Sequence, residues 1–300
     1  MGTVLEGLPQ ASRVAVIRLR SLGDCVLTTP ALAVLRRFRP DLRLSVVVEP
    51  AWRAVFEGNP DIDEILPAGM NALRRERPDL CLNLHGGRRS AWMTLASGAR
   101  YRAGFGHYRH QFAYNVRIPR AQEILQVDRT VHTAEHLASA IFYLGAPVTE
   151  IPRARLTAAQ TAAPAAVIHP AAATPDKTWQ AAGFIEIARR LQAAHSEVIF
   201  IGGGGDDLTP FREFRTLSGA PLSEIKSLLA AASVFVGNDS GPAHMAAAFG
   251  VASVVIFGAS NPAIWGPWRT PAEIVTAPGG IAHVTVEQVW GALARLRVAA

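Results

Sequence analysis

Four short stretches of this chain carry polar or glycine residues directly after an apolar run, at points where strands are expected to end. In an α/β protein, the loops at the carboxyl ends of parallel strands line the ligand-binding crevice. These stretches are therefore where chemistry is expected. They are RLRSLGDC (18–25), HPAAATPDKTW (169–179), GGGGDD (202–207) and VGNDSGPAH (236–244).

The last stretch has the pattern of an anion-binding helix start. Ser240 and Gly241 begin an Ala-rich helix, whose first backbone N–H groups have no partner within the helix and can bind a phosphate. Pro242 suits the first turn because it lacks an N–H group. Asp239 either caps this helix or orients His244, one turn further along. Capping explains the aspartate and the proline but not the glycine or the histidine, so the pattern favours a phosphate site.

Three charged residues in the other stretches each allow a structural and a chemical role. Asp24, in the first turn of a predicted helix, either complements the helix dipole or acts as a general base. Lys177 is one of only two lysines in the chain. It is either an ordinary surface lysine or the partner of a bound anion, since a cation is unfavourable at a helix start. Asp206 follows a glycine run without the GxGxxG spacing, so it either receives ribose hydroxyls or belongs to a solvated turn.

The arginines are unevenly distributed. Residues 1–150 contain 19 arginines against 14 acidic residues, whereas residues 151–300 contain 11 basic residues against 10 acidic ones. No acidic residue occurs between Asp79 and Glu123. A charge run usually marks a solvated face, but the lack of any counter-charge over this length favours a site for an anionic partner. The basic residues of this tract are His85, Arg88, Arg89, Arg100, Arg102, His107, Arg109, His110, Arg117 and Arg120.

Apolar runs alternate with helical patterns along the chain, which predicts two α/β domains with parallel sheets, joined by a proline-containing linker at 146–166. Such domains would face each other across a cleft, and the last helix packs either in its own domain or back on the first. The first domain is predicted to have strands at 13–19, 42–48, 63–67 and 79–84, and helices at 24–38 and 133–145. The second is predicted to have strands at 166–170, 197–202, 233–237 and 253–258, and helices at 178–194, 222–232, 241–250 and 285–297.

Composition excludes several classes of protein. The 300 residues are 49% apolar and 18% charged, which is typical of a globular chain. No run of eighteen apolar residues occurs, so no membrane span is predicted, and the N-terminal residues lack the pattern of a secretory signal. Only two cysteines are present, both in apolar contexts, so a reduced cytoplasmic location is expected.

These stretches make the chain resemble the bacterial heptosyltransferases of glycosyltransferase family 9 over nearly its whole length. The resemblance is carried by VIRLRSLGDCVLTTPALAVLRRFRP, DLCLNLHGGRRSA, TPDKTW and, most specifically, VGNDSGPAHMAAAFG. It implies the GT-B fold, with residues 1–150 as the acceptor-side domain and 151–300 as the nucleotide-sugar donor domain. The chain departs from the family after FIGGGG, where DDLTPFREFRTLS is shorter than the usual helix and strand. The match of Asp206 is correspondingly weaker.

The resemblance also implies roles for individual residues. Asp24 matches the catalytic base of the family, and the Arg-rich tract corresponds to the side that meets a phosphorylated lipid acceptor. The implied donor-binding residues are Lys177, Asp206, Asp239, Ser240, Gly241 and His244, and the implied acceptor-binding residues are His85, Arg88 and Arg89.

The expected reaction is an inverting transfer of heptose from ADP-heptose to a lipopolysaccharide core, without a metal or cofactor. The enzyme is expected in the cytoplasm, with peripheral contact at the inner membrane through its basic residues. A sugar-nucleotide epimerase on the same fold is the first alternative, and it would lack a basic acceptor face. A polyanion-binding module is the second, but the basic residues are not interleaved with stacking aromatics, so no nucleic-acid partner is expected.

Overall fold

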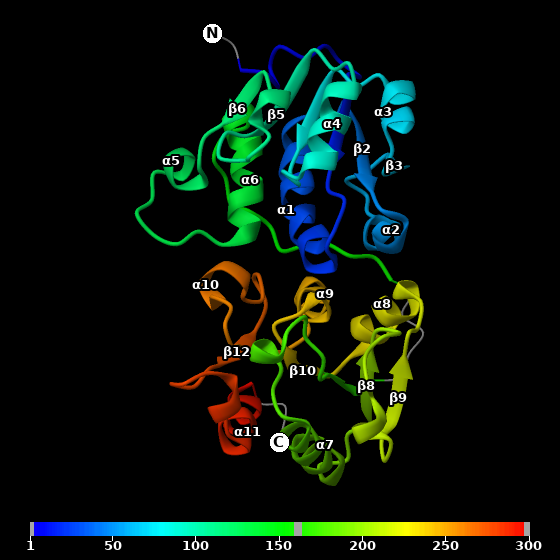
Figure 1. Cartoon of the computed structure of the whole chain (residues 1–300), viewed down its shortest axis with the longest axis vertical. Coiled ribbons are helices and arrows are strands. Elements are labelled where there is room, and N and C mark those ends of the chain that lie inside the picture. Colours follow the sequence, from blue (N-terminus) through cyan, green and yellow to red (C-terminus); the bar gives the residue numbers. More distant parts are fainter. Residues whose placement is uncertain (1–2, 159–163, 297–300) are drawn as a thin grey trace. The chain divides into compact units, whose positions relative to one another are not determined.

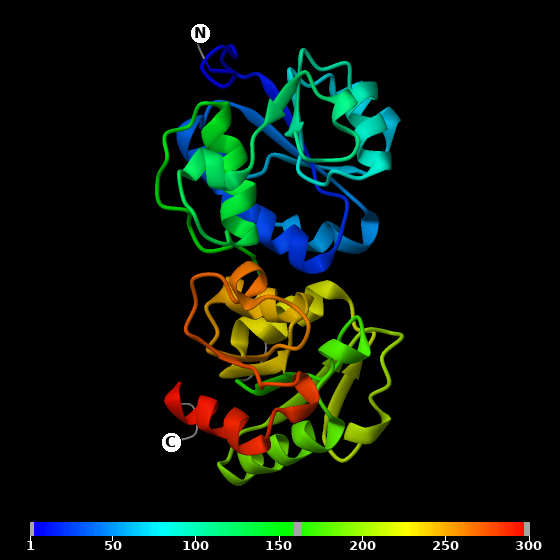
Figure 2. The same cartoon turned by 60° about the vertical axis from the view of Figure 1, so that its left-hand side comes forward.

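The computed structural model describes residues 3–158 and 164–296, and the chain divides into two compact units, residues 1–155 and 156–300 (Figures 1 and 2). Within the described residues, each unit is built on a six-stranded sheet in which all paired strands are parallel. The predicted α/β class with two parallel sheets is confirmed.

In the first unit the strand order is β3-β2-β1-β4-β5-β6. The strands are β1 (Arg13–Ile17), β2 (Arg43–Val48), β3 (Glu64–Pro67), β4 (Leu80–Asn83), β5 (Tyr101–Phe105) and β6 (Val116–Ile118). The helices are α1 (Leu22–Phe38), α2 (Arg53–Phe56), α3 (Met70–Glu76), α4 (Arg88–Ala96), α5 (Ala121–Leu125) and α6 (Thr133–Leu144), with short 3₁₀ turns η1 (Pro50–Trp52) and η2 (Gln111–Ala113).

The central strands of this sheet are apolar on both faces because helices cover both. Alternate residues of a strand point to opposite faces, and Val14, Ala15, Val16 and Ile17 of β1 are all fully buried. On one face, Ala15 and Ile17 belong to a core cluster with Leu73 of α3 and with Met93 of α4. The cluster fixes the position of α4, whose first turn follows the β4 loop.

In the second unit the strand order is β12-β11-β10-β7-β8-β9. The strands are β7 (Ala166–His169), β8 (Val198–Gly202), β9 (Arg215–Ser218), β10 (Val234–Asn238), β11 (Ser253–Ile256) and β12 (Ala272–Val275). The helices are α7 (Ala181–Ala193), α8 (Leu222–Ala231), α9 (Gly241–Phe249), α10 (Pro262–Trp265) and α11 (Val286–Arg295), with 3₁₀ turns η3 (Pro175–Lys177), η4 (Thr209–Phe211) and η5 (Ile281–His283).

The last helix, α11, packs in its own unit. Its apolar side chains Val289, Ala292 and Leu293 are buried in the same core cluster as Phe184 of α7 and Ile256 of β11. The apolar stripe of this helix is therefore used against the second sheet.

Both units share one topology. Numbered within its own unit, each sheet has the order 3-2-1-4-5-6 of a doubly wound fold. The direction of winding reverses between the first and fourth strands, so that β1 lies beside β4 and β7 lies beside β10. Ligands of such sheets bind at the carboxyl ends of these two strands. In each unit, the loops that follow them contain candidate stretches.

Strands β5, β6, β9 and β12 and helices α2, α3, α4, α5 and α10 were not among the elements predicted from the sequence. A parallel strand, β9, follows the glycine-rich turn and pairs with β8, with only the η4 turn between them. The sequence prediction had no strand there, because RTLS is polar and mostly exposed. Helix α7 begins at Ala181 rather than at Thr178.

The division between the units follows Arg155, within the segment predicted as a linker. Ile151 and Ala154 are buried, and the backbone N–H of Arg155 donates to Oγ1 of Thr29 at 2.9 Å. These contacts attach residues 151–155 to the first unit. Among the residues that the structure describes, no helix has both the length and the apolar character needed to cross a membrane.

Candidate functional site

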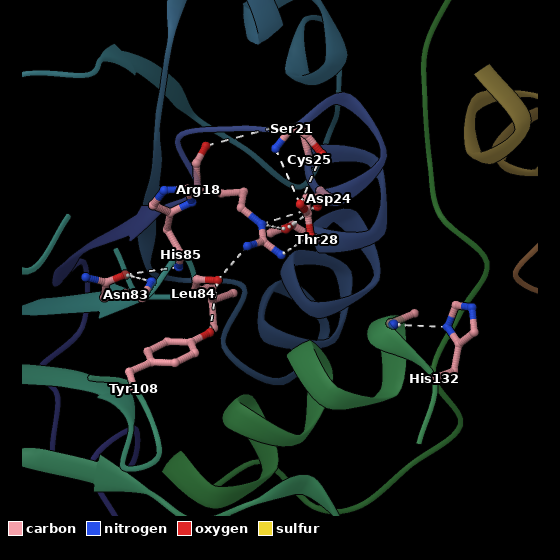
Figure 3. A network of polar contacts seen from close by, with 12 residues as sticks. Arg18, Ser21, Asp24, Cys25, Thr28, Asn83, Leu84, His85, Tyr108 and His132 are labelled. Carbon is pink, nitrogen blue, oxygen red and sulfur yellow. Dashed lines mark hydrogen bonds and ion pairs between the residues drawn. The ribbon is translucent and has the colours of Figure 1, made fainter. Parts of the chain in front are cut away.

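The loop after β1 is organised by Arg18, a buried cation that the sequence analysis did not single out (Figure 3). Its guanidinium Nη2 lies 2.9 Å from Oδ1 of Asp24, Nε donates to Oγ1 of Thr28 at 3.1 Å, and Nη1 donates to the carbonyl of Leu84 at 2.8 Å. The arginine therefore connects the loop after β1 to the loop after β4. The feature of the sequence that could have identified Arg18 is the position of a cation directly after a buried strand.

Asp24 lies in the first turn of α1 and has both an ion pair and a capping contact. Its Oδ2 accepts a hydrogen bond from the hydroxyl of Ser21 at 3.1 Å, and the Ser21 backbone N–H lies 3.4 Å from the same oxygen. The side chain is still 26% exposed, so an incoming hydroxyl group can reach the carboxylate. The capping role is thus present in the geometry, and it leaves the carboxylate accessible for proton transfer.

The loop after β4 carries His85, near the loop after β1. Oδ1 of the buried Asn83 accepts hydrogen bonds from the backbone N–H groups of His85 and Gly86, at 3.0 and 2.9 Å, which turns the chain sharply. Gly86 has a φ of +75°, and a side chain there would contact the ring of Tyr108 at 2.7 Å. Burial lowers the pKa of His85, and the charges of Arg18 and Arg20 lower it further. The imidazole is therefore neutral at neutral pH.

Arg88 and Arg89 begin α4 but are not equivalent. Arg89 lies 2.8 Å from Oε1 of Glu49, which follows β2, and also donates to the carbonyl of Ala68 at 2.7 Å. Arg88 is exposed and has no ion pair or hydrogen bond among the described residues. In the folded chain, an arginine of the acid-free tract therefore pairs with Glu49, an acidic residue from outside the tract.

Other residues of the tract have structural partners elsewhere. Arg102 donates to the carbonyls of Ala99 and Ala113, and Arg100 lies over the ring of Tyr101. The structure therefore does not assemble the whole tract into one anion site. Of the predicted acceptor-binding residues, His85 lies close enough to Arg18 and Asp24 to be affected by their charges, and both arginines at the start of α4 are exposed, with only Arg89 in an ion pair among the described residues.

In the second unit, Asn238 joins the two strands at which the winding reverses. It ends β10 and is fully buried. Its Nδ2 donates to the carbonyl of Pro170 at 2.7 Å, and its Oδ1 accepts from the backbone N–H of Trp179 at 3.1 Å. This side chain ties both ends of the β7–α7 loop to β10. The loop that carries Lys177 is therefore held in position from both sides.

Lys177 is paired with Asp239. Its Nζ lies 3.4 Å from Oδ2 of Asp239, which also accepts a hydrogen bond from the hydroxyl of Ser260. Lys177 ends the η3 turn rather than starting α7, so the helix-dipole argument made from the sequence does not apply. Instead, the ion pair with Asp239 holds the ammonium group of Lys177 in position. The lysine remains 31% exposed and can contact a bound anion.

The approach of the β11 loop to η3 requires a glycine. A Cβ atom on Gly258 would lie 2.0 Å from the carbonyl oxygen of Asp176, and the neighbouring Ala259 donates its N–H to the same oxygen at 3.3 Å. Any side chain at this position would displace η3. The glycine therefore supports the pairing of Lys177, and it was not predicted as a site residue.

Ser240 is the N-cap of α9, and Gly241 is its first residue. The N-terminal N–H groups of this helix are available to an anion because the first turn of a helix lacks internal acceptors. His244 lies in the first turn and its ring packs near Trp265 of α10, with centroids 6.4 Å apart. It is only 5% exposed. The structure therefore places Lys177, Asp239, Ser240, Gly241 and His244 around one helix start.

His169, at the end of β7, connects this helix start to the glycine-rich turn and was not predicted as a site residue. Its Nδ1 lies 3.0 Å from Oγ of Ser240, and its Nε2 lies 4.0 Å from Oδ2 of Asp206. Burial lowers its pKa to about 4, against the opposing effect of Asp206. The ring is therefore neutral at neutral pH. Its only signal in the sequence is a histidine at the end of an apolar strand.

Asp206 shapes the glycine-rich turn. Its Oδ2 accepts a hydrogen bond from the backbone N–H of Gly203 at 2.7 Å. Beside it, a cavity of about 300 Å³ lies between the loops that follow β7 and β8. The lining residues include Ala171, Ala172, Trp179, Asp206, Asp207 and Phe211. Asp206 is thus placed at the edge of a space large enough for part of a nucleotide.

No metal site is assembled in the part of the chain that the structure describes: it contains no group of three or more His, Cys, Asp or Glu side chains that could hold an ion. Asp61 and Asp63 have Asp-x-Asp spacing but precede β3, at the amino ends of the parallel strands, whereas these loops follow the carboxyl ends. Asp63 pairs with Arg36 at 2.6 Å, and Asp61 lies 3.5 Å from Arg155. Both cysteines are free and buried, and burial raises the pKa of each thiol to about 12. Neither thiol is a candidate nucleophile.

The chain is similar to known proteins over most of its length. A family model described as glycosyltransferase family 9 (heptosyltransferase) matches residues 68–288. Lipopolysaccharide heptosyltransferase 3 of Escherichia coli is 25% identical over 287 residues, which cover 83% of this chain and 84% of that protein. The structure of the family 9 glycosyl transferase from Veillonella parvula DSM 2008 matches with a TM-score of 0.84 at 22% identity, over 97% of this chain and 98% of that chain. The structure of E. coli heptosyltransferase WaaC with ADP matches with a TM-score of 0.79 at 18% identity, over 95% and 99% of the two chains. These structures confirm the expected GT-B-like fold, and because the family model spans well over half of the sequence, the chain belongs to glycosyltransferase family 9 (heptosyltransferase).

Proposed function

We propose that this enzyme transfers a heptose from ADP-heptose to a lipopolysaccharide core acceptor, with inversion at the anomeric carbon and without a metal ion. The observation that carries the proposal is the group formed by Lys177, Asp239 and the start of α9 at the point where the winding of the second sheet reverses. Support for the donor and acceptor comes from the names of the relatives, a lipopolysaccharide heptosyltransferase and WaaC with ADP.

On the donor side, Lys177 and the start of α9 are proposed to bind the diphosphate leaving group. As the bond between the anomeric carbon and the phosphate oxygen breaks, the electron pair stays on the diphosphate. Lys177 and the N–H groups at the start of α9 would stabilise that charge because they are fixed before the reaction begins. Asp206 and the adjoining cavity are assigned to the nucleoside part of the donor, and His244 supports the start of α9.

On the acceptor side, Asp24 is proposed as the general base. The acceptor oxygen would attack the anomeric carbon from the face opposite the diphosphate, which inverts the configuration, and its proton would pass to the carboxylate. Arg18 holds Asp24 in place by their ion pair. His85 and Arg88 are proposed to contact the acceptor, the histidine as a neutral hydrogen-bonding group and the arginine as a partner of its phosphate groups.

The proposal is tested by incubating the purified protein with ADP-heptose, with and without a lipopolysaccharide core acceptor. Transfer predicts ADP release that depends on the acceptor, with the opposite anomeric configuration in the product by NMR. Conversion of the donor without an acceptor would instead indicate the epimerase alternative. Binding to duplex DNA at physiological salt without turnover would indicate the polyanion-binding alternative. Activity retained in excess chelator is expected, and its loss would contradict metal independence.

A further inference from the structure

A tryptophan lies beside the start of α9 and has no part in the function proposed above. Trp265 ends α10, and the centroid of its ring lies 6.4 Å from that of His244, in the first turn of α9. The side chain of Trp265 is partly exposed, and it has no hydrogen-bond partner in the part of the chain that the structure describes. Its ring and its indole N–H group can therefore contact a ligand.

The loop that leads from β11 to α10 is attached to the proposed donor site. The backbone N–H of Ala259 donates to the carbonyl of Asp176, in the η3 turn, and the hydroxyl of Ser260 donates to Oδ2 of Asp239. The next residue, Asn261, caps α10 with its side chain. The position of this short helix is therefore fixed relative to the group that is proposed to hold the diphosphate.

The order of the strands predicts where each part of a bound donor lies. Along the carboxyl edge of the second sheet, β8 is followed by β7, then by β10 and then by β11. The proposed nucleoside cavity lies between the loops after β8 and β7, and the proposed diphosphate site is formed by the loops after β7 and β10. The nucleoside and the sugar are attached to opposite ends of the diphosphate. An extended donor would therefore place its sugar beside the loop that follows β11.

The loops after β10 and β11 are direct neighbours, as this placement requires. The two strands pair in parallel, with Asn238 opposite Ile256. Beyond this pair, the backbone N–H of Asp239 donates to the carbonyl of Ile256 at 3.1 Å. Helix α10 is the first element after β11, and Trp265 is the residue through which its ring contact with α9 is made. The strand order thus brings this tryptophan to the sugar end of the proposed donor site.

We propose that Trp265 contacts the transferred sugar of the nucleotide-sugar donor. One face of a sugar ring presents C–H groups, which suit the π-face of tryptophan, and the indole N–H can donate to a sugar hydroxyl. The inference rests on the proposed function, because it takes the start of α9 as the diphosphate site. The alternative is that Trp265 only covers His244. Its loss would then disturb the helix start whether or not a sugar is bound.

The test compares ADP with ADP-heptose, because only the second ligand carries a sugar. Each variant is titrated calorimetrically with each ligand in the absence of an acceptor. W265A should weaken binding of ADP-heptose about tenfold, because the apolar contact with one ring face is lost. Its affinity for ADP should not change. W265F keeps a ring but lacks the N–H donor, so it should weaken binding of ADP-heptose by about threefold.

The matched control is W290F, which changes a tryptophan elsewhere in the same unit. Trp290 lies on α11, and its ring is next to Arg190 in the last turn of α7, whereas the loop with Lys177 precedes the first turn of that helix. W290F should bind both ligands as the wild type does. Thermal unfolding curves check that each variant is folded. In turnover, W265A should raise KM for ADP-heptose by a larger factor than it lowers kcat.

Equal losses of ADP and ADP-heptose affinity in W265A would overturn the proposal, because a residue that only covers His244 predicts this result. Unchanged affinity for ADP-heptose in folded W265A would also overturn it. If the wild type binds neither ligand, both the sugar contact and the proposed donor are wrong. If W265A loses affinity only for ADP-heptose but the wild type transfers no heptose to a lipopolysaccharide core, the proposed transfer fails and the sugar contact stands.

Discussion

His169 gives a sharp test of the donor site, because its two ring nitrogens face different partners. Nδ1 lies 3.0 Å from Ser240 Oγ, at the start of α9, and Nε2 lies 4.0 Å from Asp206, in the glycine-rich turn. The side-chain amide of asparagine can occupy the position of Nδ1, whereas that of glutamine reaches the position of Nε2. H169N therefore preserves the contact with Ser240, and H169Q preserves the contact with Asp206.

The expected magnitude follows from the contact that each variant loses. A hydrogen bond between neutral groups contributes about 0.5–1.5 kcal/mol, which corresponds to a change of roughly 2- to 12-fold in a dissociation constant. If Ser240 contacts the diphosphate, H169Q should weaken ADP binding by this factor and H169N should bind almost as the wild type does. The longer contact with Asp206 is worth less, because 4.0 Å exceeds the usual hydrogen-bond distance.

The assay is isothermal titration of each variant with ADP, accompanied by a thermal unfolding curve. H195N is the matched control, because His195 is exposed in the same unit and lies at a φ of +63° that asparagine tolerates. Its ADP affinity should not change. Equal loss of affinity in H169N and H169Q, or no loss in either, would refute the assignment of His169 as the residue that positions Ser240.

Four further predictions concern the charged groups. D24N should lower turnover by about 10²–10⁴-fold, the usual contribution of a general base, and should also lower the melting temperature because Arg18 loses its partner; near-normal kcat would rule out the base role. K177A should weaken ADP binding roughly 10- to 150-fold, as a charge-assisted contact of about 1.5–3 kcal/mol implies, and unchanged affinity by titration calorimetry would make this lysine an ordinary surface residue. R88Q should raise KM for a phosphorylated acceptor in a salt-dependent way while R89Q changes it less, so equal kinetics of the two variants would contradict the distinction drawn between them. Burial lowers the pKa of His136 from 6.5 to about 4, so its contribution to stability is complete above pH 6.5 and is lost as the pH falls towards 4; H136Q should flatten the pH dependence of the melting temperature over this window, and an unchanged profile would contradict it.

The local elements around the site could be predicted from the sequence. The apolar run at 234–236, followed by Ser240, Gly241 and Pro242, specifies a buried strand and a helix start, because each residue matches the backbone position that it occupies. The position of Asp24 in the first turn of α1 could be predicted from the sequence for the same reason. In contrast, β9 was not recognised, since its polar, mostly exposed residues carry no periodic apolar signal.

The partners of the charged groups were decided only by the tertiary structure. Arg18 reaches Leu84 because β1 lies beside β4, and His169 reaches Ser240 because β7 lies beside β10. These pairings join residues 66 and 71 positions apart, and no local pattern encodes the strand order that creates them. The acid-free tract shows the same limit, because Glu49, which follows β2 and lies outside the tract, pairs with Arg89. The sequence by itself determined which residues follow the predicted strands around the site, and the order of the strands decided which of them meet, since that order depends on the packing of the whole unit.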